Sequence, residues 1–300
     1  MKHVAIIPAH NEAEYIGRTL DSLIAQSERP DRLLVVDDGS TDATARIVQD
    51  YMREHPWIRL MRRRSDGARS YRVIEVFQDG YDTVKDERFE FISKLDADLV
   101  FPPDYFARLF DAMAADPTIA TASGTLYEVM AAGRLMRLRM PEHHVPGALK
   151  TMRRAVFDAM GGFMPVLGWD VLDLVKIRMM GYRSITLADL TVLHMRRHAS
   201  AGGILRGNAR VGRGAYVIGS HPLFALARSA YRMLEPPYVI GGLALGYGYF
   251  SSWLSGVPQI TDRSLVRALR REQLFRLLHR NRTPALVADC PRPSWVPDAM

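Results

Sequence analysis

Short apolar runs and amphipathic stretches take turns along the first hundred residues. The apolar runs have the length of buried strands, and the stretches between them repeat apolar residues at helical spacing. The runs lie near 3–8, 32–37, 57–61 and 89–95, and the helical stretches lie near 13–26, 41–54 and 71–84. Regular alternation of strands and helices predicts a parallel sheet covered by helices.

Polar residues that favour helix starts follow the first two predicted strands. Asn11 and Glu14 have the spacing of a capping box, and Ser40 and Thr41 place hydroxyls before the next helix. We therefore expect both loops to turn from strand into helix. In open α/β sheets, ligands bind where the carboxyl ends of such strands meet.

The next hundred residues show a less regular pattern. A helix is predicted from the two prolines at 102–103 to about 116, followed by a strand over 119–129. A later helical stretch places Asp170 and Asp173 three residues apart near its start, and therefore near one face. His194 lies at the end of the strand pattern that follows.

The last hundred residues differ in composition from the rest. Residues 196–282 contain fourteen arginines and three acidic residues, while residues 236–261 carry no formal charge and include several tyrosines and a tryptophan. An uncharged, glycine-rich stretch with arginines on both flanks favours an interfacial or re-entrant membrane element over a simple span. We expect a helical, membrane-associated extension over 201–300, after a catalytic domain over 1–200 with halves 1–100 and 101–200.

Length and composition narrow the class of protein. Three hundred residues, 48% of them hydrophobic, are enough for one large α/β domain with an appendage. The single cysteine, Cys290, excludes an internal disulfide or a multi-thiolate metal site. No charged and apolar leader precedes the first strand, so we expect a cytoplasmic protein, peripheral or monotopic at the inner face of the membrane.

Two carboxylates follow the fourth apolar run. Asp96 and Asp98 are two residues apart at a strand end, where alternate side chains point the same way. Paired carboxylate oxygens suit a hard divalent cation such as Mg²⁺ or Mn²⁺. A solvated turn is the alternative, since aspartate is common in turns.

Five segments taken together resemble the family 2 glycosyltransferases, which have the GT-A fold. The segments are PAHNE at 8–12, VVDDGSTDAT at 35–44, LDAD at 95–98, GWDVLD at 168–173 and His194. The resemblance covers about residues 1–200. It implies a Rossmann-like, mostly parallel sheet and the inverting transfer of a sugar from a nucleotide-diphosphate donor to an acceptor hydroxyl.

The resemblance also assigns roles to individual residues. It implies that nucleotide is bound by Pro8, His10, Glu12, Asp38, Arg69, Asp96 and Ala97, with Arg64 and Arg72 as alternatives to Arg69. Asp98 is expected to bind the cation directly, with Asp96 nearer the ribose. His194 resembles the late histidine that approaches the metal or the diphosphate.

An inverting transfer needs a general base that takes the proton of the acceptor hydroxyl. The resemblance points to Asp170, and Asp173 is the alternative because the usual acidic spacing is shifted by one residue here. Either aspartate could instead be stabilised by the dipole at a helix N-terminus.

The sequence therefore predicts a metal-dependent glycosyltransferase with Mg²⁺ or Mn²⁺ as cofactor. Its expected partners are a nucleotide-diphosphate sugar, a glycan or lipid-linked acceptor and an anionic membrane surface, with no nucleic acid. Synthesis of a surface polysaccharide or glycolipid is the predicted process. A glycoside hydrolase with paired carboxylates, or a non-catalytic basic module for membrane or nucleic acid, are the alternatives.

Overall fold

The computed structural model describes residues 1–63, 72–129, 135–138, 140–196 and 203–279. Its chain forms two compact units. The first contains Met1–Phe163 and Tyr182–Arg197, and the second contains Met164–Gly181 and His198–Asp289. The second unit therefore takes in a segment from the middle of the chain, and a division at residue 200 stays a prediction.

The described residues of the first unit form nine strands and five helices. The strands are β1 (His3–Ala9), β2 (Arg32–Asp38), β3 (Ile58–Arg63), β4 (Phe91–Leu95), β5 (Leu99–Val100), β6 (Ile119–Val129), β7 (Leu135–Arg137), β8 (Leu149–Arg153) and β9 (Arg183–His194). The helices are α1 (Ile16–Ile24), α2 (Thr44–Glu54), α3 (Arg72–Val84), α4 (Tyr105–Ala115) and α5 (Arg154–Ala159).

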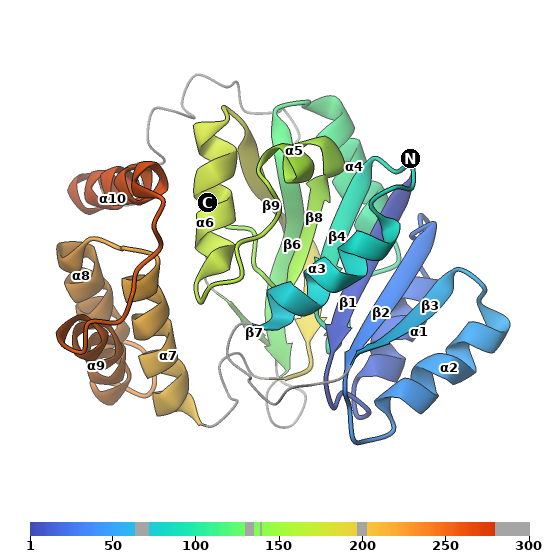
Figure 1. Ribbon diagram of the computed structural model, residues 1–300, viewed down its shortest axis with the longest axis horizontal. Coiled ribbons are helices and arrows are strands. Elements are labelled where there is room, and N and C mark those ends of the chain that lie inside the picture. The colour runs from blue at the N-terminus through green and yellow to red at the C-terminus, as the bar shows by residue number, and fades with distance from the viewer. Residues whose placement is uncertain (64–71, 130–134, 139, 197–202, 280–300) are drawn as a thin grey trace. The chain divides into compact units, whose positions relative to one another are not determined.

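All nine strands belong to one sheet with the order β3-β2-β1-β4-β8-β6-β9-β5, and β7 pairs with β6 (Figure 1). The strands β3, β2, β1 and β4 are parallel, as the alternation of the first hundred residues predicts. Beyond them β8 is antiparallel to both of its neighbours, and β6 and β9 are parallel. The sheet is therefore mixed in its second half.

The alternation of side chains along β1 builds a core on each face of the sheet. Ala5 and Ile7 join one fully buried cluster with Leu20 of α1 and Leu109 of α4. Ile6 points to the opposite face, which α3 and α5 cover (Figure 1). This layering leaves the carboxyl ends of β1, β2 and β4 on one edge of the sheet.

The predicted capping box at Asn11 and Glu14 is wrong. Helix α1 begins at Ile16, and no side chain caps it. Asn11 instead takes a left-handed conformation with φ of 56°, and its side-chain oxygen accepts a hydrogen bond from the Thr41 amide at 2.8 Å. A short polar side chain can satisfy backbone donors outside its own helix, and this partner lies in the next loop.

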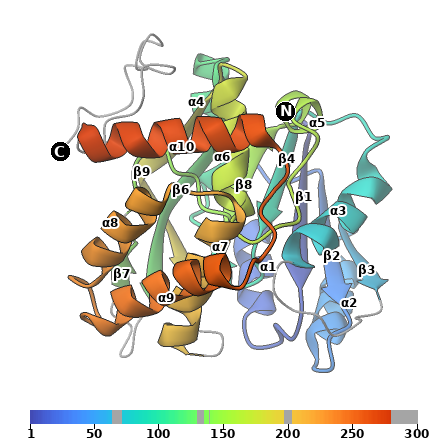
Figure 2. The ribbon, with the colours of Figure 1, turned by 60° about the vertical axis from the view of Figure 1, so that its left-hand side comes forward.

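The described residues of the second unit form five helices. They are α6 (Trp169–Met179), α7 (Ile204–Val217), α8 (Pro222–Arg232), α9 (Ile240–Leu254) and α10 (Arg263–Leu278), as Figure 2 shows for the last four. The helical prediction for this region is correct. Within the described residues, no helix is both long enough and apolar enough to cross a membrane.

Glycines set the spacing of α7, α8 and α9. A Cβ on Gly212 of α7 would collide with the Leu245 carbonyl of α9, and one on Gly248 would collide with the Ala209 carbonyl of α7. A Cβ on Gly242 would likewise collide with the Ser229 carbonyl of α8. The backbones of these helices therefore pack in direct contact.

Candidate active site

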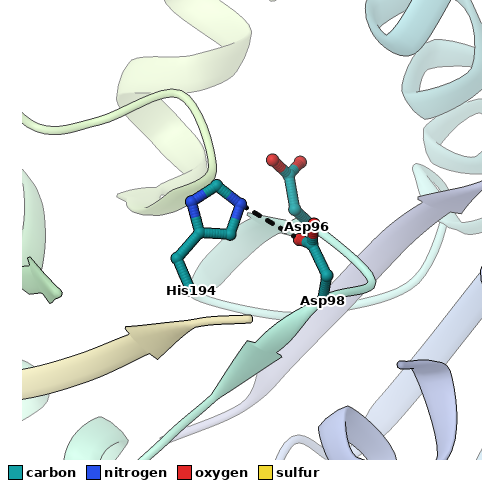
Figure 3. A group of neighbouring side chains, drawn as sticks. All are labelled: Asp96, Asp98 and His194. Carbon is teal, nitrogen blue, oxygen red and sulfur yellow. Dashed lines mark ion pairs between the residues drawn. The ribbon is translucent and has the colours of Figure 1, made fainter. Parts of the chain in front are cut away.

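Asp96, Asp98 and His194 lie together at the carboxyl edge of the sheet (Figure 3). The two aspartates occupy the turn between β4 and β5, and His194 ends β9. Strand β5 pairs with β9 so that Leu99 lies opposite His194. One donor atom from each of the three side chains lies within 4.8 Å of the other two.

Within this group, Asp98 and His194 are in direct contact. His194 Nε2 lies 3.3 Å from Oδ1 of Asp98, and both side chains are buried. Burial opposes ionisation of Asp98, but the hydrogen bond and charge of His194 outweigh it and lower the pKa of the carboxyl. Burial likewise opposes protonation of His194, and the bond to Asp98 outweighs it and raises the pKa of the imidazole.

The donor set fits a divalent cation. Two ligands at right angles on a metal about 2.1 Å away are separated by roughly 3 Å, close to the spacing of His194 and Asp98. Carboxylate oxygen suits Mg²⁺ and Mn²⁺, and an imidazole nitrogen is a good additional ligand for Mn²⁺. Among the described residues, this is the group of carboxylate and imidazole side chains with metal-binding geometry.

Lys94 gives Asp96 a different environment from Asp98. The Lys94 side chain is 2% exposed and its ammonium pairs with Oδ1 of Asp96, whose side chain is 33% exposed. A fixed cation thus already balances one oxygen of Asp96. This arrangement supports Asp98 as the direct metal ligand, with Asp96 turned toward the solvent side of the site.

Arg196 connects Asp98 with Glu12. Its guanidinium pairs with Oε2 of Glu12, and its Nε lies 3.7 Å from Oδ2 of Asp98. The same guanidinium stacks on the ring of Tyr15, 5.1 Å from its centroid. Burial raises the pKa of Glu12 to about 7 even though Arg196 opposes the shift, and the nearby carboxylate of Asp98 adds to it.

Hydrogen bonds tie the loop after β1 to the loop after β2. His10 Nδ1 lies 2.8 Å from the Asp38 carbonyl, and the Asn11 amide donates to Oγ of Ser40 at 2.9 Å. The Glu12 amide donates to Oγ1 of Thr44 at 2.8 Å. Residues 10–12 are therefore held beside Asp38 by the partner loop.

Asp38 lies between two arginines. Its Oδ1 is 3.4 Å from Nε of Arg63 and 3.7 Å from Nη2 of Arg72, and Arg63 also approaches Asp79 at 3.2 Å. Asp38 and Arg72 are both buried. Asp37 is fully buried and accepts a hydrogen bond from the Ser40 amide at 3.0 Å, so it braces the loop.

Of the remaining residues predicted to contact nucleotide, some lie within the described part of the chain and others do not. Pro8 is half-buried in β1, and the buried Ala97 accepts a hydrogen bond from Oγ1 of Thr19 through its carbonyl at 2.7 Å. Arg69 and its alternative Arg64 lie outside the described residues. The other alternative, Arg72, is the one that the structure brings to Asp38.

Asp170 and Asp173 occupy the start of α6 in the second unit. Asp170 is half-buried and interacts electrostatically with Arg228, whereas Asp173 is 2% exposed. A buried bidentate pair anchors the same helix, because Arg178 donates to both carboxylate oxygens of Glu272 at 2.8 and 2.6 Å. The proximity of either aspartate to the cation site stays a prediction.

The chain matches the model of a known protein family. The model of the family described as Glycosyl transferase family 2 matches residues 4–165, more than half of the chain. The chain belongs to glycosyl transferase family 2. This match favours a glycosyltransferase over the two alternatives, a glycoside hydrolase and a non-catalytic binding module.

The chain is also similar to part of a longer protein. It is 29% identical to chondroitin synthase of Escherichia coli over 132 residues, which are 43% of this chain and 18% of that protein. The match therefore spans less than a fifth of this relative.

Two solved glycosyltransferases share the fold. The mannosyltransferase PcManGT from Pyrobaculum calidifontis, in complex with GDP-Man and Mn²⁺, has a TM-score of 0.55 at 19% identity, over 92% of this chain and 80% of its own. GalNAc-T7 with UDP, GalNAc and Mn²⁺ has a TM-score of 0.58 at 15% identity, over 92% and 57%. The predicted GT-A fold is confirmed.

Three positively charged side chains at the candidate site were not identified from the sequence. Lys94 lies two residues before Asp96, and Arg196 lies two residues after His194, so each shares a side of its backbone with a predicted ligand. Arg63 lies opposite Asp38 in the register of β2 and β3. The first two spacings were visible in the sequence, whereas the third required the strand register.

Proposed function

We propose that this family 2 enzyme is a metal-dependent, inverting glycosyltransferase that uses a nucleotide-diphosphate sugar. The observation that carries the proposal is the group of Asp96, Asp98 and His194 at the carboxyl edge of the sheet. The pairs of Lys94 with Asp96 and of Arg196 with Asp98 add fixed positive charge beside it. A diphosphate is the substrate group that such a site would stabilise.

The nucleotide half of the donor would lie along the loops after β1 and β2, which hydrogen bonds hold together. Asp38 would accept a hydrogen bond from the base or the ribose, next to His10 and Arg72. Asp96 would face the ribose. Mg²⁺ or Mn²⁺, held by Asp98 and His194, would supply positive charge against the diphosphate oxygens.

In the transfer, the acceptor oxygen attacks the anomeric carbon from the face opposite the leaving group. The bond from this carbon to the diphosphate oxygen breaks, and the nucleoside diphosphate leaves with both electrons. Asp170 takes the acceptor proton. The lower exposure of Asp173 supports Asp170 over it, because a general base must reach a hydroxyl that enters from solvent.

The proposed acceptor is a lipid-linked sugar or a growing surface polysaccharide at the inner face of a membrane. Two observations support it. The chain is similar to a polysaccharide synthase, and its last hundred residues combine many arginines with an uncharged, aromatic segment. The base and sugar of the donor are open, so the proposal extends to guanosine and uridine diphosphate sugars alike.

A panel of sugar nucleotides tests the proposal. We expect one of them to release its nucleoside diphosphate in the presence of Mn²⁺ or Mg²⁺, and chelator to stop the release. Asp170→Asn should lower kcat at least a hundredfold with little change in donor KM, since a general base contributes roughly 10²- to 10⁴-fold. Asp104→Asn, which alters an exposed carboxylate just before the start of α4, is the matched control. Full turnover in excess chelator would contradict the metal role.

A further inference from the structure

Helix α9 is apolar on its exposed side as well as on its buried side. Its buried face contains Leu245, Gly248, Tyr249 and Ser252, which pack within the second unit. Ile240, Leu243, Tyr247 and Leu254 are 50%, 56%, 71% and 81% exposed. At 100° per residue these four side chains fall within a sector of about 60°. A helix that is apolar all round is normally enclosed, and this one is not.

Helix α8 repeats the pattern. Leu223 and Leu226 are 58% and 56% exposed, and Leu234 just beyond the helix is 73% exposed. With the exposed Ala230 they fall within a sector of roughly 80° at helical spacing. No charged side chain lies within this sector.

The two exposed stripes lie on the same side of the helix pair. Helices α8 and α9 run antiparallel, because Gly242 near the start of α9 lies against Met233 at the end of α8, whereas Tyr249, two turns later, shares a buried cluster with Ala225 near the start of α8. Each helix touches its neighbour along one line and exposes its apolar stripe on another. Around the axis of each helix, viewed from its N-terminus, the stripe lies roughly 90° to 110° from the line of contact, and it is rotated in the same direction in both helices. For an antiparallel pair, equal displacements in the same sense point in one direction. We call the surface formed by Leu223, Leu226, Leu234, Ile240, Leu243, Tyr247 and Leu254 the α8–α9 surface.

The charge around the α8–α9 surface suits an anionic membrane. Residues 236–261 contain no acidic or basic residue. Arg206, Arg210 and Arg213 are exposed on α7. Helix α7 packs directly on α9, and the axes of helices in contact are about 8 to 10 Å apart. This separation is about one Debye length at physiological salt. Arginines near a lipid surface are attracted by its negative potential.

Exposed aromatic side chains with polar tips lie on α8, on α9 and between them. Tyr231, Tyr238, Tyr247 and Trp253 are each at least 59% exposed. Tyrosine and tryptophan favour the boundary between lipid headgroups and acyl chains. Together with the arginines of α7, these side chains favour a lipid headgroup boundary over a second protein copy.

We propose that the α8–α9 surface lies flat in the headgroup–acyl boundary of an anionic bilayer and docks the enzyme there. This inference deepens the proposed function, since it names the surface that would bring the enzyme to a membrane-linked acceptor. The exposed stripe of α9 runs from Ile240 to Leu254, about 21 Å at 1.5 Å per residue, so it suits an in-plane helix.

Vesicle co-sedimentation of the full chain tests the inference. We expect binding to vesicles of phosphatidylcholine with phosphatidylglycerol, weaker binding to phosphatidylcholine alone, and partial loss at high salt. The double variant Leu226→Glu/Leu243→Glu should lower the partition coefficient at least tenfold, because two exposed leucines of the surface become charged. Leu135→Glu, the same exchange at an exposed leucine of β7, should bind as the unaltered protein does.

Two further measurements separate the outcomes. Equal vesicle binding by the double variant and the unaltered protein would overturn the inference. So would a lipid-free dimer that the double variant breaks, because the surface would then be an interface between copies. Release of nucleoside diphosphate from a soluble sugar nucleotide should be unchanged in the double variant. If the unaltered protein releases no nucleoside diphosphate from any sugar nucleotide, that result counts against the proposed function, and the vesicle result is unaffected.

Discussion

His194 Nε2 lies 3.3 Å from Oδ1 of Asp98, although Asp98 follows β4 and His194 ends β9, far apart in the chain. The antiparallel pairing of β5 with β9 makes this approach possible, since it sets Leu99 opposite His194. Each partner shifts the pKa of the other toward the charged form. A cation held by both side chains would take the place of any proton on the imidazole, so we expect tighter cation binding at higher pH.

Arg196 competes for the carboxylate that we propose as metal ligand. Its Nε lies 3.7 Å from Oδ2 of Asp98, with a side chain that is 38% exposed. We expect Arg196→Met to raise Mn²⁺ affinity several-fold in a calorimetric titration, because a fixed positive charge is removed. Arg18→Met, on the exposed side of α1, is the charge-matched control. Weaker Mn²⁺ binding by Arg196→Met would show that the guanidinium supports the site.

Asp38 should affect donor binding more than its neighbour Asp79 does. Both carboxylates approach Arg63, but Asp38 is buried and Asp79 has a side chain that is 43% exposed. A hydrogen bond to a charged group contributes about 1.5–3 kcal/mol, so Asp38→Asn should raise donor KM roughly tenfold or more. Asp79→Asn should change KM by less than about threefold, as expected for a partly exposed pair. Equal effects of the two exchanges would contradict a nucleotide contact at Asp38.

Two glycines of α9 should respond in opposite directions to the same substitution. A Cβ at position 248 would collide with the Ala209 backbone, whereas one at position 246 would meet Oγ of Ser229 at 3.4 Å. We expect Gly248→Ala to lower the free energy of unfolding by about 3 kcal/mol through overpacking. Gly246→Ala should leave it unchanged or raise it by up to about 1 kcal/mol through helix propensity. Thermal denaturation followed by circular dichroism measures both, and equal destabilisation would contradict the close packing of α7 and α9.

Because the imidazole of His3 is buried, we expect the free energy of unfolding to fall on mild acidification. Its ring is fully buried, with Nε2 2.7 Å from Oγ of Ser93 and its edge against Phe106, and burial lowers the pKa of the imidazole to about 3. The unfolded chain binds a proton near pH 6.5 and the folded chain does not, so the stability is present above this pH and is lost as the pH falls toward 3.

The loss attributable to His3 is about 2 kcal/mol at about pH 5. Urea denaturation at about pH 7 and about pH 5 measures it, with His3→Gln as the comparison, since glutamine does not titrate in this range. The substituted protein should lose about 2 kcal/mol less than the unaltered one. The same pH dependence in both proteins would exclude His3 as the source.

The fold was predictable where local patterns carry the information. Apolar runs located β1, β2, β3 and β4 to within two residues, because buried parallel strands are nearly continuous apolar segments. The mixed second half was not predictable in this way, since the place of β8 between β4 and β6 depends on pairings between distant residues. The helix start at Asn11 was misjudged for the same reason, because its partner Thr41 lies in another loop.

At the candidate site, too, local spacing predicted some features, while others depend on pairings between distant strands. Two-residue spacing at a strand end was enough to place Asp96 and Asp98 on one side. The arrival of His194 beside them depends on the pairing of β9 with β5, which the family resemblance supplied and the residues alone did not. The position of Arg63 beside Asp38 depends on the register of β2 and β3, which no local pattern reveals.

Mn²⁺ binding followed by electron paramagnetic resonance tests the central claim most directly. The unaltered protein should bind one Mn²⁺ in the presence of uridine or guanosine diphosphate and lose it to chelator, while Asp98→Asn should leave the Mn²⁺ free at the same concentrations. Asp104→Asn should bind as the unaltered protein does, because its carboxylate is exposed and pairs with Arg108. Undiminished Mn²⁺ binding by Asp98→Asn would contradict the account.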